Sequence, residues 1–173
     1  LFTLNRRYGV QLSWIQGGIK DNAIPREASA AFVCQADLET VAACVQEMKT
    51  IFAKELEFSD AGVDVAVKEV ACDGVLCIED SEEVITLLMT LPNGLRHHSM
   101  SIEGLSTASS NIGVVTTQEE AIIINASLRG AMESYVDTLA MEMDALAEVF
   151  GFHSEHEARY PAWSYRADSP MRE

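Results

Sequence analysis

Histidines and carboxylates are the residues of this chain best suited to metal or acid–base chemistry, and their densest group lies near the end of the sequence. His153, Glu155, His156 and Glu157 fall within five positions. On a strand, His153 would point with Glu155 and Glu157, while His156 would point to the other face. Zinc needs ligands that converge on one point. The run therefore does not predict a metal site.

A second group, Arg96-His97-His98, follows a helix stop and is predicted to lie in a loop. Histidine can titrate near neutral pH or line a cleft, but adjacent loop histidines are usually solvated. The acidic pairs Glu82-Glu83 and Glu119-Glu120 fall at a predicted helix start and in a predicted turn, where helix capping and solvation explain them. No His-x-Asp, G-x-S-x-G, P-loop or G-x-G-x-x-G motif occurs in the sequence. The segment alone is expected to have no catalytic machinery.

Two further residues stand out, and each has two explanations. Asn22 lies in Asn22-Ala23-Ile24-Pro25-Arg26-Glu27, which follows a Gly-Gly pair and combines a turn-favouring Asn with a Pro of fixed φ. This is either a rigid turn or a functional loop. Arg129 ends an apolar, β-branched strand, where its planar guanidinium suits a carboxylate. The alternative is a strand-end arginine that extends to solvent.

Hydrophobic periodicity predicts the elements that position these residues. In the first half, we expect the end of a helix at 1–8, strands at 12–16 and 28–35, a helix from 38 to 56 capped by Asp37, and a strand at 63–68. In the second half, we expect a helix at 81–91, strands at 105–115 and 121–128, a helix that ends at Gly151, a closing strand at 152–159, and the opening of a further helix at 168–173. Capping boxes are predicted at Asp80 with Glu83 and at Ser134 with Asp137.

The two halves, about residues 1–79 and 80–173, share one order of elements. Glu47-Met48 can be placed on Glu142-Met143, Phe58 on Phe152, and Asn22 on Asn111. Unless this is coincidence among common α+β patterns, it is an internal pseudo-repeat. It predicts an α+β fold of two ferredoxin-like β-β-α-β halves, which form an antiparallel sheet with helices on one face.

Composition excludes several classes of protein. Of 173 residues, 48% are hydrophobic and 23% charged, which is typical of globular domains. The formal charge of -15 would repel phosphate backbones and anionic lipid, so neither nucleic acid nor a membrane is an expected partner. No apolar run approaches the roughly 20 residues of a membrane span, and the four cysteines form no C-x-x-C pair. We expect a soluble, cytoplasmic protein with free thiols.

Six motifs in order along nearly the whole chain carry a resemblance. They are Gly17-Gly18 with Asn22–Glu27, Pro92-Asn93-Gly94, Ser110–Val115, Ser127-Leu128-Arg129, Tyr160–Trp163, and Asp168-Ser169-Pro170. Each motif is weak alone, but together they resemble aminoacyl-histidine dipeptidases, also called Xaa-His dipeptidases or bacterial carnosinases. The chains of that family have a zinc-binding catalytic domain interrupted by a lid or dimerisation domain. Residues 1–173 resemble the lid, so the chain is expected to be an excised middle domain.

The resemblance implies where the chemistry lies. The ligands of the two zinc ions would belong to the absent catalytic domain, leaving neither catalytic nor metal-binding residues in this segment. Asn22 matches the family's lid asparagine at the substrate, and Arg129 matches the arginine that binds the substrate's carboxylate. Asn111 matches a recurrent asparagine whose role the resemblance does not give. The paired His97 and His98 depart from the family pattern and receive no role.

The expected parent protein is thus a cytoplasmic zinc dipeptidase that cleaves Xaa-His or similar unblocked dipeptides. Its partners would be a dipeptide substrate, its own catalytic domain and a second copy, bound through an exposed edge of the lid. Two alternatives stay open. One is a binding or oligomerisation module without catalysis, and the other is the lid of a related tripeptidase or deacylase.

Overall fold

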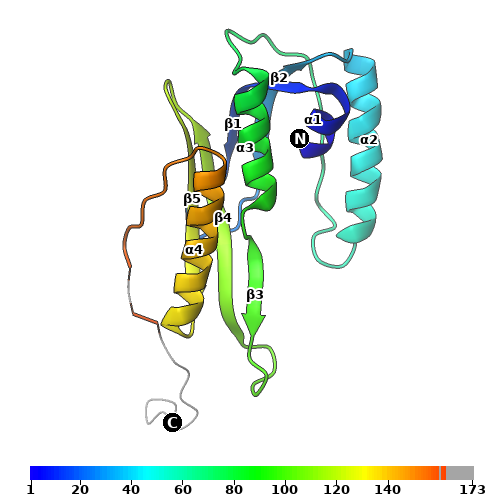
Figure 1. Cartoon of the computed structure of the whole chain (residues 1–173). Helices are drawn as coiled ribbons and strands as arrows, with labels where there is room; N and C mark the ends of the chain where they lie inside the picture. Colours follow the sequence, from blue (N-terminus) through cyan, green and yellow to red (C-terminus); the bar gives the residue numbers. More distant parts are fainter. Residues whose placement is uncertain (160, 163–173) are drawn as a thin grey trace. The chain divides into compact units, whose positions relative to one another are not determined.

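The computed structural model describes residues 1–159 and 161–162 (Figure 1). In chain order the elements are α1 (Phe2–Tyr8), β1 (Val10–Gly17), β2 (Ala28–Cys34), α2 (Leu38–Glu55), α3 (Ile78–Thr90), β3 (Gly94–His98), β4 (Ser106–Thr117), β5 (Ile122–Gly130) and α4 (Glu133–Val149). The strands form a five-stranded antiparallel sheet in the order β2-β1-β4-β3, with β5 also paired to β4. The predicted combination of helices with an antiparallel sheet is confirmed. No helix in the described part of the chain is long and apolar enough to cross a bilayer.

The chain divides into two compact units, and β1, β2 and α3 each pass from one unit to the other. Unit 1 comprises Leu1–Trp14 and Ala30–Thr86. Unit 2 comprises Ile15–Ser29 and the described residues from Leu87 onward.

The core of unit 1 contains apolar residues from helices and strands. The fully buried Leu12 of β1 donates its N–H to Oγ of the buried Ser81 at 2.9 Å, and Ser81 donates in turn to the carbonyl oxygen of Cys77 at 2.7 Å. Helix α2 begins as predicted, because the Asp37 carboxylate accepts the N–H of Thr40 at 2.8 Å. The other buried apolar residues of the unit are Leu4, Val10, Ala31, Val41, Cys44, Val84 and Ile85.

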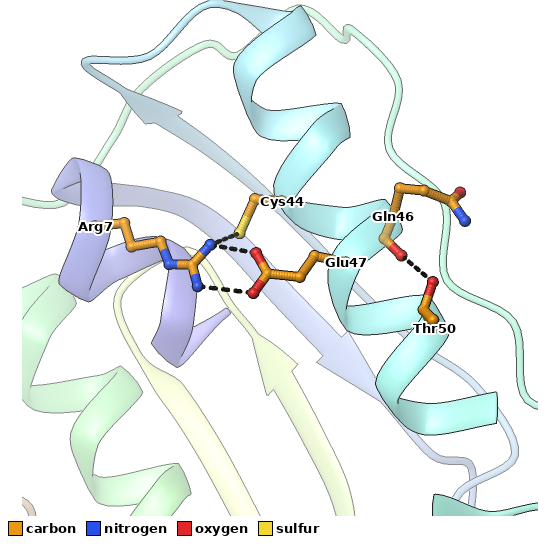
Figure 2. Close-up of polar contacts among 5 residues, drawn as sticks. All are labelled: Arg7, Cys44, Gln46, Glu47 and Thr50. Atoms are coloured by element: carbon orange, nitrogen blue, oxygen red, sulfur yellow. Dashed lines mark hydrogen bonds and ion pairs between the residues drawn. The ribbon is translucent and has the colours of Figure 1, made fainter. Parts of the chain in front are cut away.

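An arginine fork joins α1 to α2 in unit 1 (Figure 2). Arg7 donates from Nη1 to Oε2 of Glu47 at 2.6 Å and from Nη2 to Oε1 at 3.2 Å. Its Nη1 also lies 3.4 Å from Sγ of Cys44. The hydrogen bonds and charge of this guanidinium lower the pKa of the Glu47 carboxyl. A two-bond pair of this kind fixes direction as well as distance between the helices.

Two predicted strands are wrong. Residues 63–68 belong to no strand, although Val65 and Val67 are half-buried and their neighbours Asp64, Ala66 and Lys68 exposed, as the alternation requires. Residues 152–159 also belong to no strand. Side chains hold this second segment to α4 instead: Ser154 donates to Asp144 at 2.7 Å, and Arg159 donates to Asp137 at 2.6 Å.

The predicted helix starts are displaced. Helix α3 begins at Ile78, so Asp80 lies inside it and donates its N–H to Sγ of Cys77 at 3.3 Å. Helix α4 begins at Glu133 after an N-cap Met132 that makes no side-chain cap bond. Both predicted capping boxes are therefore wrong.

The helix stop at Gly151 is confirmed, since this residue has φ 71° and donates its N–H to Glu148. Arg96-His97-His98, predicted as loop, lies in β3. The predicted helix opening at 168–173 lies outside the described residues, as do Tyr160 and Trp163 of the motifs.

Strand β4 is the centre of unit 2. It pairs along its length with β5, from Ala108↔Gly130 to Thr117↔Ile122. Its other edge pairs with β3 and with the end of β1. Helix α4 packs on one face of β4 and β5 (Figure 1). A Cβ on Gly130 would overlap Val136 of that helix, so the close packing requires glycine there.

Candidate functional site

The face of β4 and β5 opposite α4 carries a group of polar side chains, here called the polar row. Side chains alternate across a strand, and residues paired across a ladder share a face. The pairs Ala108↔Gly130 and Ser110↔Leu128 face α4. The pairs Ser109↔Arg129 and Asn111↔Ser127 therefore face the other way and make up the polar row.

A connection between β1 and β2, residues 18–27, is bound to the polar row and is called here the Asn22 loop. Gly18 donates its N–H to the carbonyl of Glu27 at 3.1 Å and closes the base of the loop. Near its tip, Nδ2 of Asn111 donates to the carbonyl oxygens of Asp21, at 3.0 Å, and Ala23, at 2.9 Å. The residues on either side of Asn22 are thus held by one side chain of β4.

Two glycines let the Asn22 loop lie directly on β4. A Cβ on Gly113 would collide with the backbone of Asp21. A Cβ on Gly18, which has φ 72°, would collide with the carbonyl of Gly113. Gly113 lies where the β4–β5 register shifts, between Ile112 and Val114. These contacts explain why the motifs contain glycine at Gly18 and Gly113.

The structure places both predicted substrate residues in unit 2. Asn111 pairs with Ser127, and Arg129 lies two residues further along β5 on the same face, so Asn111 and Arg129 are diagonal neighbours in the ladder. Asn22 and Arg129 are both exposed. Within residues 1–159 and 161–162, neither side chain makes a hydrogen bond or an ion pair. Their amide and guanidinium groups are available to a ligand, while their roles stay a prediction.

A surface hollow of unit 2 lies apart from both Asn22 and Arg129. It is lined by Gln16, Gly17, Gly18, Glu27, Ala28, Ser29, Val114, Val115 and Thr116. Neither Asn22 nor Arg129 lines it, and backbone and small side chains form most of its wall. Glu27 is the one ionisable residue of its lining, beside the amide of Gln16 and the hydroxyls of Ser29 and Thr116.

The paired histidines of the sequence, His97 and His98, lie in β3, and His97 contacts α4. His97 stacks on Tyr135 of α4, with ring centroids 4.7 Å apart and planes inclined by 18°. This contact places His97 on the face of the sheet opposite Arg129. Its neighbour Arg96 donates to Glu142 of α4 at 2.7 Å. His98 is exposed and pairs with Ser106 in the ladder.

The candidate metal cluster of the sequence does not converge. His156 binds the Asp144 carboxylate at 2.9 Å, while His153 lies 3.4 Å from Glu155. A hydrogen bond from Ser154 and, less strongly, the contact with His156 lower the pKa of Asp144. Among the residues that the structure describes, no three His, Cys, Asp or Glu side chains are grouped so as to hold a metal ion. These side chains do not fit a two-zinc centre.

Known proteins are similar to this chain in both sequence and fold. Residues 3–60 match the family described as the peptidase dimerisation domain. The cytosol non-specific dipeptidase of Escherichia coli (strain K12) is 31% identical over 157 residues, which are 90% of this chain and 32% of that protein. The crystal structure of aminoacylhistidine dipeptidase from Vibrio alginolyticus matches with a TM-score of 0.89 and 28% identity, over 96% of this chain and 34% of that one. The chain spans about a third of the length of both relatives. The resemblance predicted from the motifs is confirmed.

Proposed function

We propose that this chain, whose residues 3–60 match the peptidase dimerisation domain family, is the lid of a metal-dependent dipeptidase that hydrolyses Xaa-His or similar unblocked dipeptides. The names of both relatives support a dipeptidase. The observation that carries the proposal is that Asn22 and Arg129 are both exposed and have no partners among the described residues. Both belong to unit 2, where the Asn22 loop is bound to β4, the strand paired with the one that carries Arg129.

The chemistry of the polar row fits the end of a dipeptide. A dipeptide has one terminal carboxylate, and a guanidinium can bind it with two parallel N–H···O bonds. The hydroxyls of Ser109 and Ser127 lie on the same face and add donors. The Asn22 amide can donate to the substrate at the same time. Both contacts orient the substrate, and orientation alone contributes to rate when the cleft closes.

The two zinc ions belong to the catalytic domain in this proposal. They would supply the Lewis acid of hydrolysis, and the described histidines and carboxylates of the lid would not hold them. The lid contributes carboxylate binding and closure of the active site. By itself it is expected to hydrolyse no peptide.

A second copy of the protein is the proposed protein partner. Among the described strands β5 pairs only with β4, so its other edge is open. The name of the matched domain family supports a dimer, and the name of one relative supports a cytoplasmic location. Sedimentation of the full-length protein tests the dimer, and a mass equal to one chain would overturn it.

The function is tested by assaying full-length protein against unblocked dipeptides, tripeptides and N-acyl amino acids. We expect the highest kcat/KM on dipeptides and loss of activity after chelation of the metal. Preference for a tripeptide or an acyl amino acid would favour a tripeptidase or a deacylase. A purified full-length protein that contains no zinc and hydrolyses none of these substrates would favour a binding or oligomerisation module.

A further inference from the structure

We propose that Asn111 is a positioning residue, which fixes Asn22 relative to Arg129 and does not itself contact the substrate. The inference rests on the proposed function, because it assumes that Asn22 acts on a substrate. It assigns a role to Asn111, the asparagine of the motifs whose role the resemblance does not give.

The hydrogen bonds of Asn111 carry the argument. A carboxamide nitrogen has two N–H donors. In Asn111 that nitrogen lies 3.0 Å from the carbonyl oxygen of Asp21 and 2.9 Å from that of Ala23. Both donors are therefore used on the Asn22 loop, one on each side of Asn22. They are not available to a ligand, and the remaining Oδ1 can only accept, so Asn111 has no donor left for a substrate carboxylate.

The backbone of Asn111 provides the other half of the connection. Asn111 pairs with Ser127, and the adjacent same-face pair is Ser109 with Arg129. A β ladder holds such diagonal neighbours at a fixed spacing of roughly 7 to 8 Å. One residue thus links the strand that carries Arg129 to the loop that carries Asn22, across about 90 positions of sequence.

Few other contacts hold the Asn22 loop in place. Its two large apolar side chains, Ile19 and Ile24, are 84% and 85% exposed, so they do not anchor it in a core. The backbone contact with Gly113 limits how close the loop comes to the sheet, but it supplies no donor. Among the residues that the structure describes, the paired hydrogen bonds from Asn111 are the ones that tie the loop around Asn22 to the sheet.

Substitution separates positioning from folding. Asn111→Asp keeps the size of the side chain but replaces the donors with a carboxylate, which repels the two carbonyl oxygens. Asn111→Ala removes the donors without adding charge and leaves the carbonyls, at an exposed site, to water. Asn125→Asp is the matched control: it adds the same charge to β5 at an exposed asparagine, which makes no side-chain hydrogen bond among the described residues.

The experiment uses full-length enzyme, one Xaa-His dipeptide, and both Asn111 variants in wild-type and Asn22→Ala backgrounds. We expect Asn111→Ala to reduce kcat/KM by about tenfold in the wild-type background and by less than about twofold when Asn22 is already Ala. Asn111→Asp also adds a carboxylate beside Arg129, so it should lose activity in both backgrounds. Hydrogen exchange should quicken at the Ala23 amide, which donates to the carbonyl of Lys20 within the loop, and stay unchanged in β4 and β5. Asn125→Asp should change neither measurement.

Three results would overturn the inference, and they differ in what else they overturn. Equal losses from Asn111→Ala in both backgrounds, or unchanged exchange of the Ala23 amide, would show that Asn111 does not act through Asn22 and would leave the proposed function intact. An Asn22→Ala enzyme with wild-type kcat/KM would overturn the role of Asn22 in the proposed function and this inference with it.

Discussion

Replacement of Arg129 by lysine tests the substrate site most directly, since it keeps the charge and removes the planar fork. Arg129 makes no hydrogen bond or ion pair within residues 1–159 and 161–162, so its loss should not destabilise the fold. A lysine ammonium offers a point contact in place of two parallel N–H···O bonds. The loss of one charge-assisted hydrogen bond in a closed cleft costs about 1.4 kcal/mol or more of transition-state binding. This corresponds to a reduction of kcat/KM by at least about tenfold.

The assay compares a Xaa-His dipeptide with its C-terminal amide in full-length enzyme. Arg129→Lys should lose activity on the dipeptide and little on the amide, because only the dipeptide has a carboxylate to bind. Arg96→Lys is the control: it is the same exchange in unit 2, but Arg96 pairs with Glu142 of α4, on the other face of the sheet. Equal losses on both substrates, or no loss on either, would refute the assignment of Arg129.

Three further variants test the packing around the site and the two units. Gly113→Ala should displace the Asn22 loop and lower kcat/KM severalfold with a small change in Tm, because its Cβ would collide with the Asp21 backbone; a wild-type rate would contradict this. The Arg7 fork depresses the pKa of Glu47, so its stabilisation is present above the usual carboxyl pKa and is lost as the pH falls through the folded value. The urea midpoints of wild type and Glu47→Gln should therefore differ at pH 7 and converge as the pH falls below the usual carboxyl range, and a gap that persists at low pH would contradict the linkage. Asp144→Asn should speed exchange of the Phe152 amide, which donates to the carbonyl of Ala147 at the start of the segment whose Ser154 and His156 Asp144 binds, and unchanged exchange would show that other contacts hold the segment.

Local signals in the sequence predicted local structure well. The Asp37 cap, the helix that follows it and the glycine stop at Gly151 depend on residues only a few positions apart, and all three are confirmed. Alternation at 63–68 was misleading for a physical reason. It indicates an extended backbone with one face packed, but it does not supply a neighbouring strand with which to form a ladder. The opposite error occurred at Gly94–His98, where a polar segment pairs with β4 despite having no buried face.

The candidate site was only partly predictable from sequence. The types of Asn22 and Arg129 and their family resemblance pointed to both residues, and the structure places both in one unit. The contribution of Asn111 could not be predicted, because it depends on hydrogen bonds to residues 88 and 90 positions away. The contact between Gly113 and Asp21 is likewise a property of the folded chain. The sequence shows Gly113 within a motif, but only the fold shows that a larger residue there would collide with Asp21.

The way Asn111 holds its loop has a consequence for how the protein can diverge. Both hydrogen bonds end on main-chain carbonyl oxygens, which every amino acid possesses. The side chains of Ile19, Lys20 and Ile24 are exposed and take no part in the restraint. Evolution can therefore exchange them, and so alter what the loop presents, without releasing the loop from the sheet. Such a surface separates the identity of its side chains from the geometry that carries them, as antibody frameworks do for their hypervariable loops.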